Sequence, residues 1–189
     1  MEITDQEKIL ITIAKILDDL KIEYFITGGF AVSVWGRPRA TFDIDIIIKL
    51  VKPNVTTLAR ALRGICKAGY VDENMMADAI SNNGEFNFID PNSGLKVDFW
   101  VMRKEGLDVE RLKNKKTKII SGQKVYFSSP EDLILSKLEW YKECRSSRHL
   151  EDIESIFKIS GDKLDKKYLN KWVDKLGLSD FLDKVKNKL

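Results

Sequence analysis

The stretch ITGGFAVSVWGRPRATFDIDIII, from Ile26 to Ile48, carries two carboxylates inside a segment that is otherwise typical of β-structure. Asp43 and Asp45 alternate there with apolar residues, so both side chains point to one face of the predicted strand Phe42–Leu50. Like charges this close repel each other, and burying them without a partner is costly. A cation bound between the two carboxylates would remove both problems.

A pair of glycines precedes this strand. Gly28 and Gly29 follow a short predicted strand, Glu23–Thr27, and precede a brief predicted helix, Phe30–Trp35. Backbone N–H groups at such a helix start can hold phosphate, and glycine lets the phosphate approach closely. A glycine pair alone usually marks a tight turn, but its position between a strand and a helix indicates a phosphate site.

A third carboxylate lies on a later strand. Asp98 belongs to the segment Lys96–Met102 (KVDFWVM), which is predicted to form a hairpin with Glu85–Ile89 through the DPNSG turn. If this strand lies beside Phe42–Leu50, the spacing of about 4.8 Å between neighbouring strands puts Asp98 next to the first two carboxylates. Three carboxylates on one sheet face are a site for Mg²⁺, which prefers hard oxygen ligands.

The rest of the chain predicts an α+β protein. A helix begins at the capping box TDQE, another covers Asn54–Lys67, and a second hairpin turns at Ser121-Gly122. After the N-cap Ser129 the chain is helical over about Pro130–Cys144, His149–Ile159, Leu164–Leu176 and Asp180–Lys188. We therefore predict a small mixed sheet flanked by helices in residues 1–128. A helical subdomain packed on this core is predicted for residues 129–189.

The composition bounds the classes of protein that need consideration. Hydrophobic residues at 43% and charged residues at 32% describe a globular chain, and its apolar runs are too short to span a bilayer. Isolated Cys66 and Cys144 and the lack of a signal-like N-terminus favour a reduced, cytoplasmic protein. The single His149 leaves little material for a histidine-based zinc site. The basic run Arg111–Pro130 is either a solvated face or a surface that attracts nucleotide or RNA.

Basic side chains near these motifs have two readings each. Lys137 has only apolar or aromatic helical neighbours: Leu133, Ile134, Trp140 and Tyr141. A lysine in that position either snorkels to water or holds an anion. Arg37 and Arg39, in the loop before the D-x-D strand, either bind phosphate or belong to a solvated loop, with Arg39 favoured as the phosphate ligand.

The order of these motifs resembles the signature of the nucleotidyltransferase superfamily with the DNA polymerase β-type fold. Gly28-Gly29 is followed by thirteen residues and then Asp43-Ile44-Asp45, and Asp98 fits the third carboxylate position. The variant RATFDID, Arg39–Asp45, is similar to the bacterial branch that includes AbiEii-type toxins and small antibiotic nucleotidyltransferases. The resemblance covers residues 24–50, 96–101 and, more loosely, 128–157.

This resemblance implies an enzyme that moves a nucleoside monophosphate from an NTP to an acceptor hydroxyl and releases pyrophosphate. It implies two Mg²⁺ ions, with Mn²⁺ as the alternative, held by Asp43 and Asp45. Asp98 would be a ligand of the second ion or the base for the acceptor hydroxyl. The residues implied in nucleotide binding are Gly28, Gly29, Arg39, Thr41, Lys137 and Asp152. Asp152 lies four positions after Arg148.

Several functions stay open at this point. The acceptor is tRNA or another RNA, a protein side chain, or a small antibiotic. A non-catalytic nucleotide-binding module on the same fold is the alternative from another class, for example a toxin–antitoxin regulator with a cognate antitoxin as partner. An unrelated Mg²⁺-dependent phosphohydrolase is disfavoured, because no phosphatase-type nucleophile or histidine accompanies the D-x-D. No membrane partner is expected.

Overall fold

The computed structural model describes residues 4–187, which pack as two compact units. Unit 1 consists of residues 4–30 and 41–127, and unit 2 of residues 31–40 and 128–187. The loop that precedes the D-x-D strand is thus divided, because residues 31–40 group with the C-terminal helices. The division into domains at residues 128 and 129 stays a prediction.

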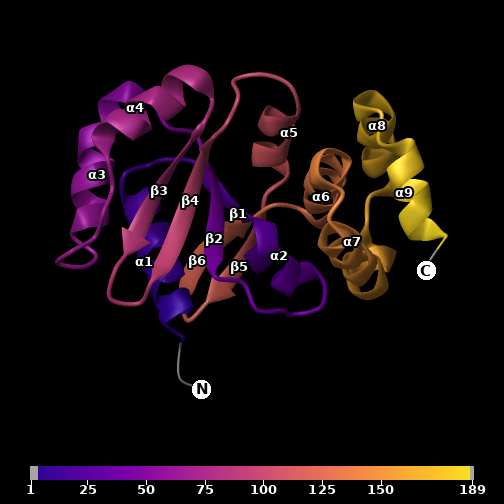
Figure 1. Cartoon of the computed structure of the whole chain (residues 1–189), viewed down its shortest axis with the longest axis horizontal. Helices are drawn as coiled ribbons and strands as arrows, with labels where there is room; N and C mark the ends of the chain where they lie inside the picture. The colour runs from indigo at the N-terminus through magenta and orange to yellow at the C-terminus, as the bar shows by residue number, and fades with distance from the viewer. Residues whose placement is uncertain (1–3, 188–189) are drawn as a thin grey trace. The chain divides into compact units, whose positions relative to one another are not determined.

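Unit 1 is built on a six-stranded mixed sheet with the strand order β3-β4-β2-β1-β6-β5 (Figure 1). The strands are β1 Tyr24–Thr27, β2 Asp43–Ile48, β3 Glu85–Asp90, β4 Leu95–Val101, β5 Lys116–Ile120 and β6 Gln123–Phe127. The pairs β2–β4 and β1–β6 are parallel, and the other neighbours are antiparallel. Both predicted hairpins, β3–β4 and β5–β6, are confirmed, as is the mixed sheet of the predicted α+β fold.

One face of the sheet forms the core of unit 1 with the helices α1 Asp5–Asp19, α3 Val55–Arg63 and α4 Glu73–Asn82. Alternation along β2 sends Ile44, Ile46 and Ile48 to this face, where all three are fully buried. The opposite face, which carries Asp43 and Asp45 and is called the carboxylate face below, is only partly covered. Helix α5, Leu107–Asn114, packs over one end of it through a cluster of Phe25, Met102 and Leu112 with Ile47.

The N-terminal helix has the predicted cap, whereas two helices in unit 1 were not predicted. Thr4 and Glu7 form a capping box at the start of α1, with the Thr4 side chain accepting from the Glu7 N–H at 3.2 Å. Helix α4 buries only Met76 and Ala79 among its own apolar residues, and α5 is still more polar. Neither carries the hydrophobic periodicity that identifies a helix, because their few buried side chains gain their contacts from the sheet.

Unit 2 is helical, with α6 Pro130–Cys144, α7 Ser147–Ser160, α8 Lys166–Leu176 and α9 Ser179–Lys186 (Figure 1). Helix α6 begins as predicted, with the Ser129 side chain accepting from the Asp132 N–H at 3.1 Å. The end of α2, Gly28–Trp35, is tied into this unit, because the Trp35 indole donates to the Ser128 carbonyl at 2.9 Å. Among residues 4–187, no helix combines the length and apolar character that a membrane crossing requires.

Candidate functional site

A row of polar residues crosses four strands on the carboxylate face. Thr27 of β1 lies opposite Asp45 of β2, Asp45 lies opposite Asp98 of β4, and Asp98 lies opposite Asn87 of β3. Strands about 4.8 Å apart therefore bring two carboxylates from distant parts of the sequence side by side. The predicted neighbourhood of the D-x-D strand and the strand that carries Asp98 is confirmed.

Asp43 lies on the same face, at the start of β2. Its Oδ1 accepts a hydrogen bond of 2.7 Å from the Thr41 hydroxyl, which orients the carboxylate. The Gln6 side chain donates to the Thr41 carbonyl at 3.2 Å and so ties this loop to α1. Thr41 thus orients Asp43, while its role in nucleotide binding stays a prediction, and Gln6 is a support that sequence reasoning did not find.

Lys96 is the cation of this group. It lies opposite Asp43 in the β2–β4 register, and its Nζ is 2.9 Å from Asp98 Oδ2. The hydrogen bond with Asp98 raises the pKa of Lys96 against the opposing effect of partial burial. Sequence reasoning missed Lys96, although the alternation in KVDFWVM puts it on the same face as Asp98.

Gly28 brings the start of α2 against the D-x-D strand. Its φ of +63° lies in the left-handed region, and a Cβ at this position would overlap the Asp45 carboxylate. Only glycine allows this approach of the helix start to the carboxylate. Gly29 follows in the first turn of α2. Gly28 therefore lies directly beside Asp45, and the phosphate-binding role of the glycine pair stays a prediction.

The oxygen atoms on the carboxylate face are of the chemical kind that binds divalent cations. Asp45 and Asp98 supply adjacent hard oxygen ligands, and the Lys96 ammonium already neutralises charge at Asp98 as a cation would. Within residues 4–187, however, no set of three or more Asp, Glu, His or Cys side chains is drawn together closely enough to hold a metal. Because Asp98 is paired with Lys96, a cation that binds this carboxylate oxygen would have to replace that ion pair.

The remaining predicted residues meet inside unit 2. Arg39 donates from Nε and Nη2 to the two carboxylate oxygens of Asp152, at 2.7 and 2.9 Å, and Lys137 Nζ is 3.1 Å from Asp152 Oδ2. Burial alone would raise the pKa of Asp152, but the hydrogen bonds from Arg39 and the charge of Lys137 outweigh it and lower that pKa. Lys137 is buried and does not snorkel, because the anion it holds is the chain's own carboxylate.

His149 lies near enough to Arg39, Asp152 and Lys137 for their charges to act on it. Its Nδ1 is buried and has no hydrogen-bond partner among residues 4–187. Burial lowers the pKa of His149, and the positive charge of Lys137 lowers it further. The imidazole is therefore held in its neutral form to a lower pH than an exposed histidine.

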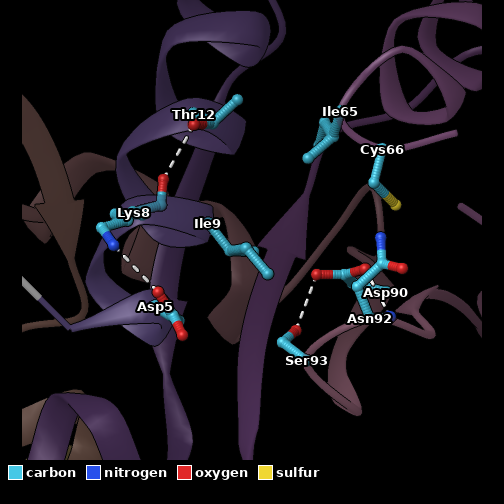
Figure 2. A pocket seen from close by; sticks show the side chains of 9 residues that line it. All are labelled: Asp5, Lys8, Ile9, Thr12, Ile65, Cys66, Asp90, Asn92 and Ser93. Carbon is cyan, nitrogen blue, oxygen red and sulfur yellow. Dashed lines mark hydrogen bonds and ion pairs between the residues drawn. The ribbon is translucent and has the colours of Figure 1, made fainter.

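A hollow of about 400 Å³ lies elsewhere on unit 1, between α1, the segment after α3 and the β3–β4 turn (Figure 2). Figure 2 shows Asp90 in its wall, where the carboxylate accepts from the Ser93 hydroxyl at 2.7 Å. Asp90 shares a strand face with Phe86 and Phe88, so this hollow lies on the helix-covered side of the sheet. None of the predicted site residues lines it.

Comparison with known proteins supplies the class of fold. No family model and no curated protein matches the sequence. Among solved structures, the antibiotic-resistance factor ANT(2'')-Ia has a TM-score of 0.61 at 14% identity, over 95% of this chain and 97% of its own. The lincosamide antibiotic adenylyltransferase LnuA, bound to lincomycin, has a TM-score of 0.55 at 15% identity, over 84% of this chain and 99% of its own.

A further match is an antigenic nucleotidyltransferase-like protein from Paracoccidioides brasiliensis, with a TM-score of 0.54 at 23% identity over 80% of this chain and 75% of its own. The chain thus has the nucleotidyltransferase fold. Its structural neighbours include the small antibiotic-modifying kind, so the predicted resemblance is confirmed at the level of the fold.

Proposed function

We propose that this chain is a nucleotidyltransferase that moves a nucleoside monophosphate from an NTP to an acceptor hydroxyl, with Mg²⁺ as cofactor. The pairing of Asp45 with Asp98, next to a helix start where only glycine fits, carries this proposal. These are the two groups that such a reaction needs, namely oxygen ligands for cations and a glycine-containing helix start that phosphate can approach closely. The nucleotidyltransferase fold supports the same conclusion.

Each residue has a separate role in the proposal. The N–H groups at Gly28 and Gly29 bind phosphate oxygens of the NTP. Asp43, Asp45 and Asp98 would hold the cations, with Thr41 orienting Asp43. When bound, Mg²⁺ supplies charge neutralisation at the phosphates and lowers the pKa of the acceptor hydroxyl.

Asp98 serves the acceptor side. The acceptor oxygen forms a bond to the α-phosphorus, the bond from that phosphorus to the bridging oxygen breaks, and pyrophosphate leaves with the bonding electron pair. In the proposal the hydroxyl proton passes to the Asp98 carboxylate. Such a base must lie within hydrogen-bond reach of the proton, which places the acceptor hydroxyl beside β4.

Arg39 and Lys137 stay predicted nucleotide-binding residues in this proposal. Both are fixed by one buried carboxylate, Asp152, so two positive charges share one negative charge and the group keeps a net positive charge. Fixed cations of this kind suit phosphate oxygens, because little side-chain entropy is lost on binding. Replacing Lys137 with alanine is expected to weaken NTP binding, as measured by calorimetry with each of the four NTPs and Mg²⁺.

An assay of nucleotide transfer from radiolabelled NTPs would identify the acceptor. ANT(2'')-Ia has been seen with adenylyl-2''-tobramycin and LnuA with lincomycin, which makes small hydroxylated antibiotics the first class to test here. The protein and Mg²⁺ are incubated with each radiolabelled NTP and one of three acceptor conditions: a panel of aminoglycosides and lincosamides, total tRNA, or no added acceptor. Label transfer then shows whether the protein modifies a small molecule, RNA or itself. No transfer to any of the three, with intact NTP binding, would favour the non-catalytic alternative.

Two variants test the assignment of the site. Asp45→Asn and Asp98→Asn are expected to lower the transfer rate by a factor on the order of 10³ or more, because each removes a charged group from the transition state. Asp98→Asn should retain most of the NTP affinity. Asp78→Asn, an exposed position on α4, is the matched control and should transfer at the wild-type rate. Wild-type transfer by Asp98→Asn would remove Asp98 from the site.

A further inference from the structure

Lys96 stands among the carboxylates at a position that the transfer reaction does not by itself require. Its partner in the strand register is Asp43, and its ammonium forms an ion pair of 2.9 Å with Asp98. The two ends of this pair differ in burial, because the Asp98 side chain is 11% exposed and the Lys96 side chain 47%. The carboxylate is thus fixed in the sheet, while the lysine stem reaches it from the solvent side.

The charge arrangement favours a cation beside Asp98. Asp98 and Asp45 lie directly opposite each other on neighbouring strands, where like charges destabilise a sheet. Asp98 is also nearly buried, so an unpaired charge there would carry a desolvation cost. In the protein without metal, the Lys96 ammonium offsets both terms.

We propose that Lys96 is an internal counter-ion that neutralises Asp98 in the metal-free protein and must release it before a divalent cation can use that carboxylate. This inference rests on the proposed metal site of the nucleotidyltransferase. A lysine is suited to the exchange, because its long flexible stem can move the ammonium into water without a change in the backbone. Lys96 and the divalent cation are therefore competitors for one ligand.

Competition of this kind has two measurable consequences. Removing the ammonium should make divalent cations bind more tightly, since the cation no longer displaces a bound charge or meets a positive neighbour. Removing it should also lower the melting temperature of the metal-free protein, because the opposed carboxylates lose their counter-ion. If Lys96 only held phosphate, its removal would leave the affinity for divalent cations unchanged in the absence of nucleotide.

The test compares Mn²⁺ binding, by calorimetry and by the electron paramagnetic resonance of free Mn²⁺, in nucleotide-free wild type and Lys96→Met. Methionine keeps most of the apolar stem and removes the charge. We expect the Mn²⁺ affinity of Lys96→Met to rise by roughly three- to tenfold, within the range for loss of a partly exposed ion pair and a nearby like charge. The melting temperature without metal should fall by a few degrees.

Lys49→Met is the matched control. Lys49 is 56% exposed and forms an ion pair of 2.7 Å with Glu23, but it lies beyond the other end of β2, four residues from Asp45. It tests whether the loss of any ion-paired lysine changes Mn²⁺ affinity through net charge alone. Equal gains in Lys96→Met and Lys49→Met, or no gain in Lys96→Met, would overturn the proposal.

A third variant separates this inference from the proposed function. If Mn²⁺ binds to wild type and binding is lost in Asp45→Asn, the metal site stands whatever the outcome for Lys96. If Lys96→Met then shows unchanged affinity, only the counter-ion role is wrong. If wild type and Lys96→Met both fail to bind Mn²⁺, with or without NTP, the metal site and the counter-ion proposal fail together.

Discussion

Asp152→Asn is expected to lower the unfolding free energy strongly. The Asp152 side chain is 3% exposed and accepts three charged contacts, at 2.7 and 2.9 Å from Arg39 and 3.1 Å from Lys137. Asparagine keeps the shape of the side chain but removes its charge and one of its two acceptor oxygens. The ammonium of Lys137, whose side chain is 8% exposed, is then left in the interior without the Asp152 counter-charge.

The size of the loss in unfolding free energy depends on which cation is left buried without a counter-charge. The Arg39 side chain is 24% exposed and can recover part of its hydration, whereas Lys137 cannot. Removing one partner of a buried ion pair costs about 3–5 kcal/mol of unfolding free energy, and we expect the lower end because the asparagine oxygen still accepts from Arg39. For a chain of this length, about 3 kcal/mol lowers the melting temperature by roughly 6–12 °C.

Urea unfolding, followed by circular dichroism, measures the effect. Glu151→Gln removes a charge from the exposed neighbouring position of the same helix, and it should change the unfolding free energy by no more than about 0.5 kcal/mol. The double variant Lys137→Met with Asp152→Asn should recover about 1–3 kcal/mol relative to the sum of the single losses, because no ammonium is then stranded. A loss in Asp152→Asn no larger than in Glu151→Gln would refute the burial argument.

Three further outcomes are expected. Gly28→Ala should lose more unfolding free energy than Gly122→Ala, measured by urea unfolding, because both have positive φ but only the first Cβ would overlap the Asp45 carboxylate, whereas the second meets open space; equal losses would contradict this close approach. Asp45→Asn should raise the melting temperature of the metal-free protein, because it removes the like charge opposite Asp98, and a lower melting temperature would contradict the repulsion. Because the pKa of His149 is lowered from its ordinary value of 6.5, the unfolded chain takes up a proton before the folded chain does, so stability falls as the pH drops below about 6.5. His149→Asn should reduce this loss of unfolding free energy between pH 7.5 and about 5.5, measured by urea unfolding. An unchanged pH dependence would contradict the lowered pKa of His149.

Local signals were sufficient for most of the elements. The capping box at Thr4, the N-cap Ser129 with its following proline, and the period-two pattern of β2 each depend on residues a few positions apart. Helix α6 therefore has its predicted bounds, Pro130–Cys144. Helices α4 and α5 were missed because the contacts that stabilise them come from outside their own segments.

The sequence by itself also determined which residues could form the site on the carboxylate face. Two aspartates at an interval of two residues must share a strand face, and a glycine pair at the start of a helix lets phosphate approach the backbone closely. Asp98 could be chosen as the third carboxylate only under the condition that its strand lies beside β2. That condition is a matter of strand order, which no local pattern encodes.

Only the tertiary structure decided what each charge pairs with. The parallel register of β2 and β4 put Asp98 opposite Asp45 and Lys96 opposite Asp43, and the same fold joined Arg39 to Asp152 across 113 positions of sequence. A lone lysine on an apolar helix face, such as Lys137, is equally compatible with snorkelling and with anion binding. The choice depends on whether a carboxylate is buried within about 3–4 Å, and electrostatic energy at that range is set by distance and burial in three dimensions.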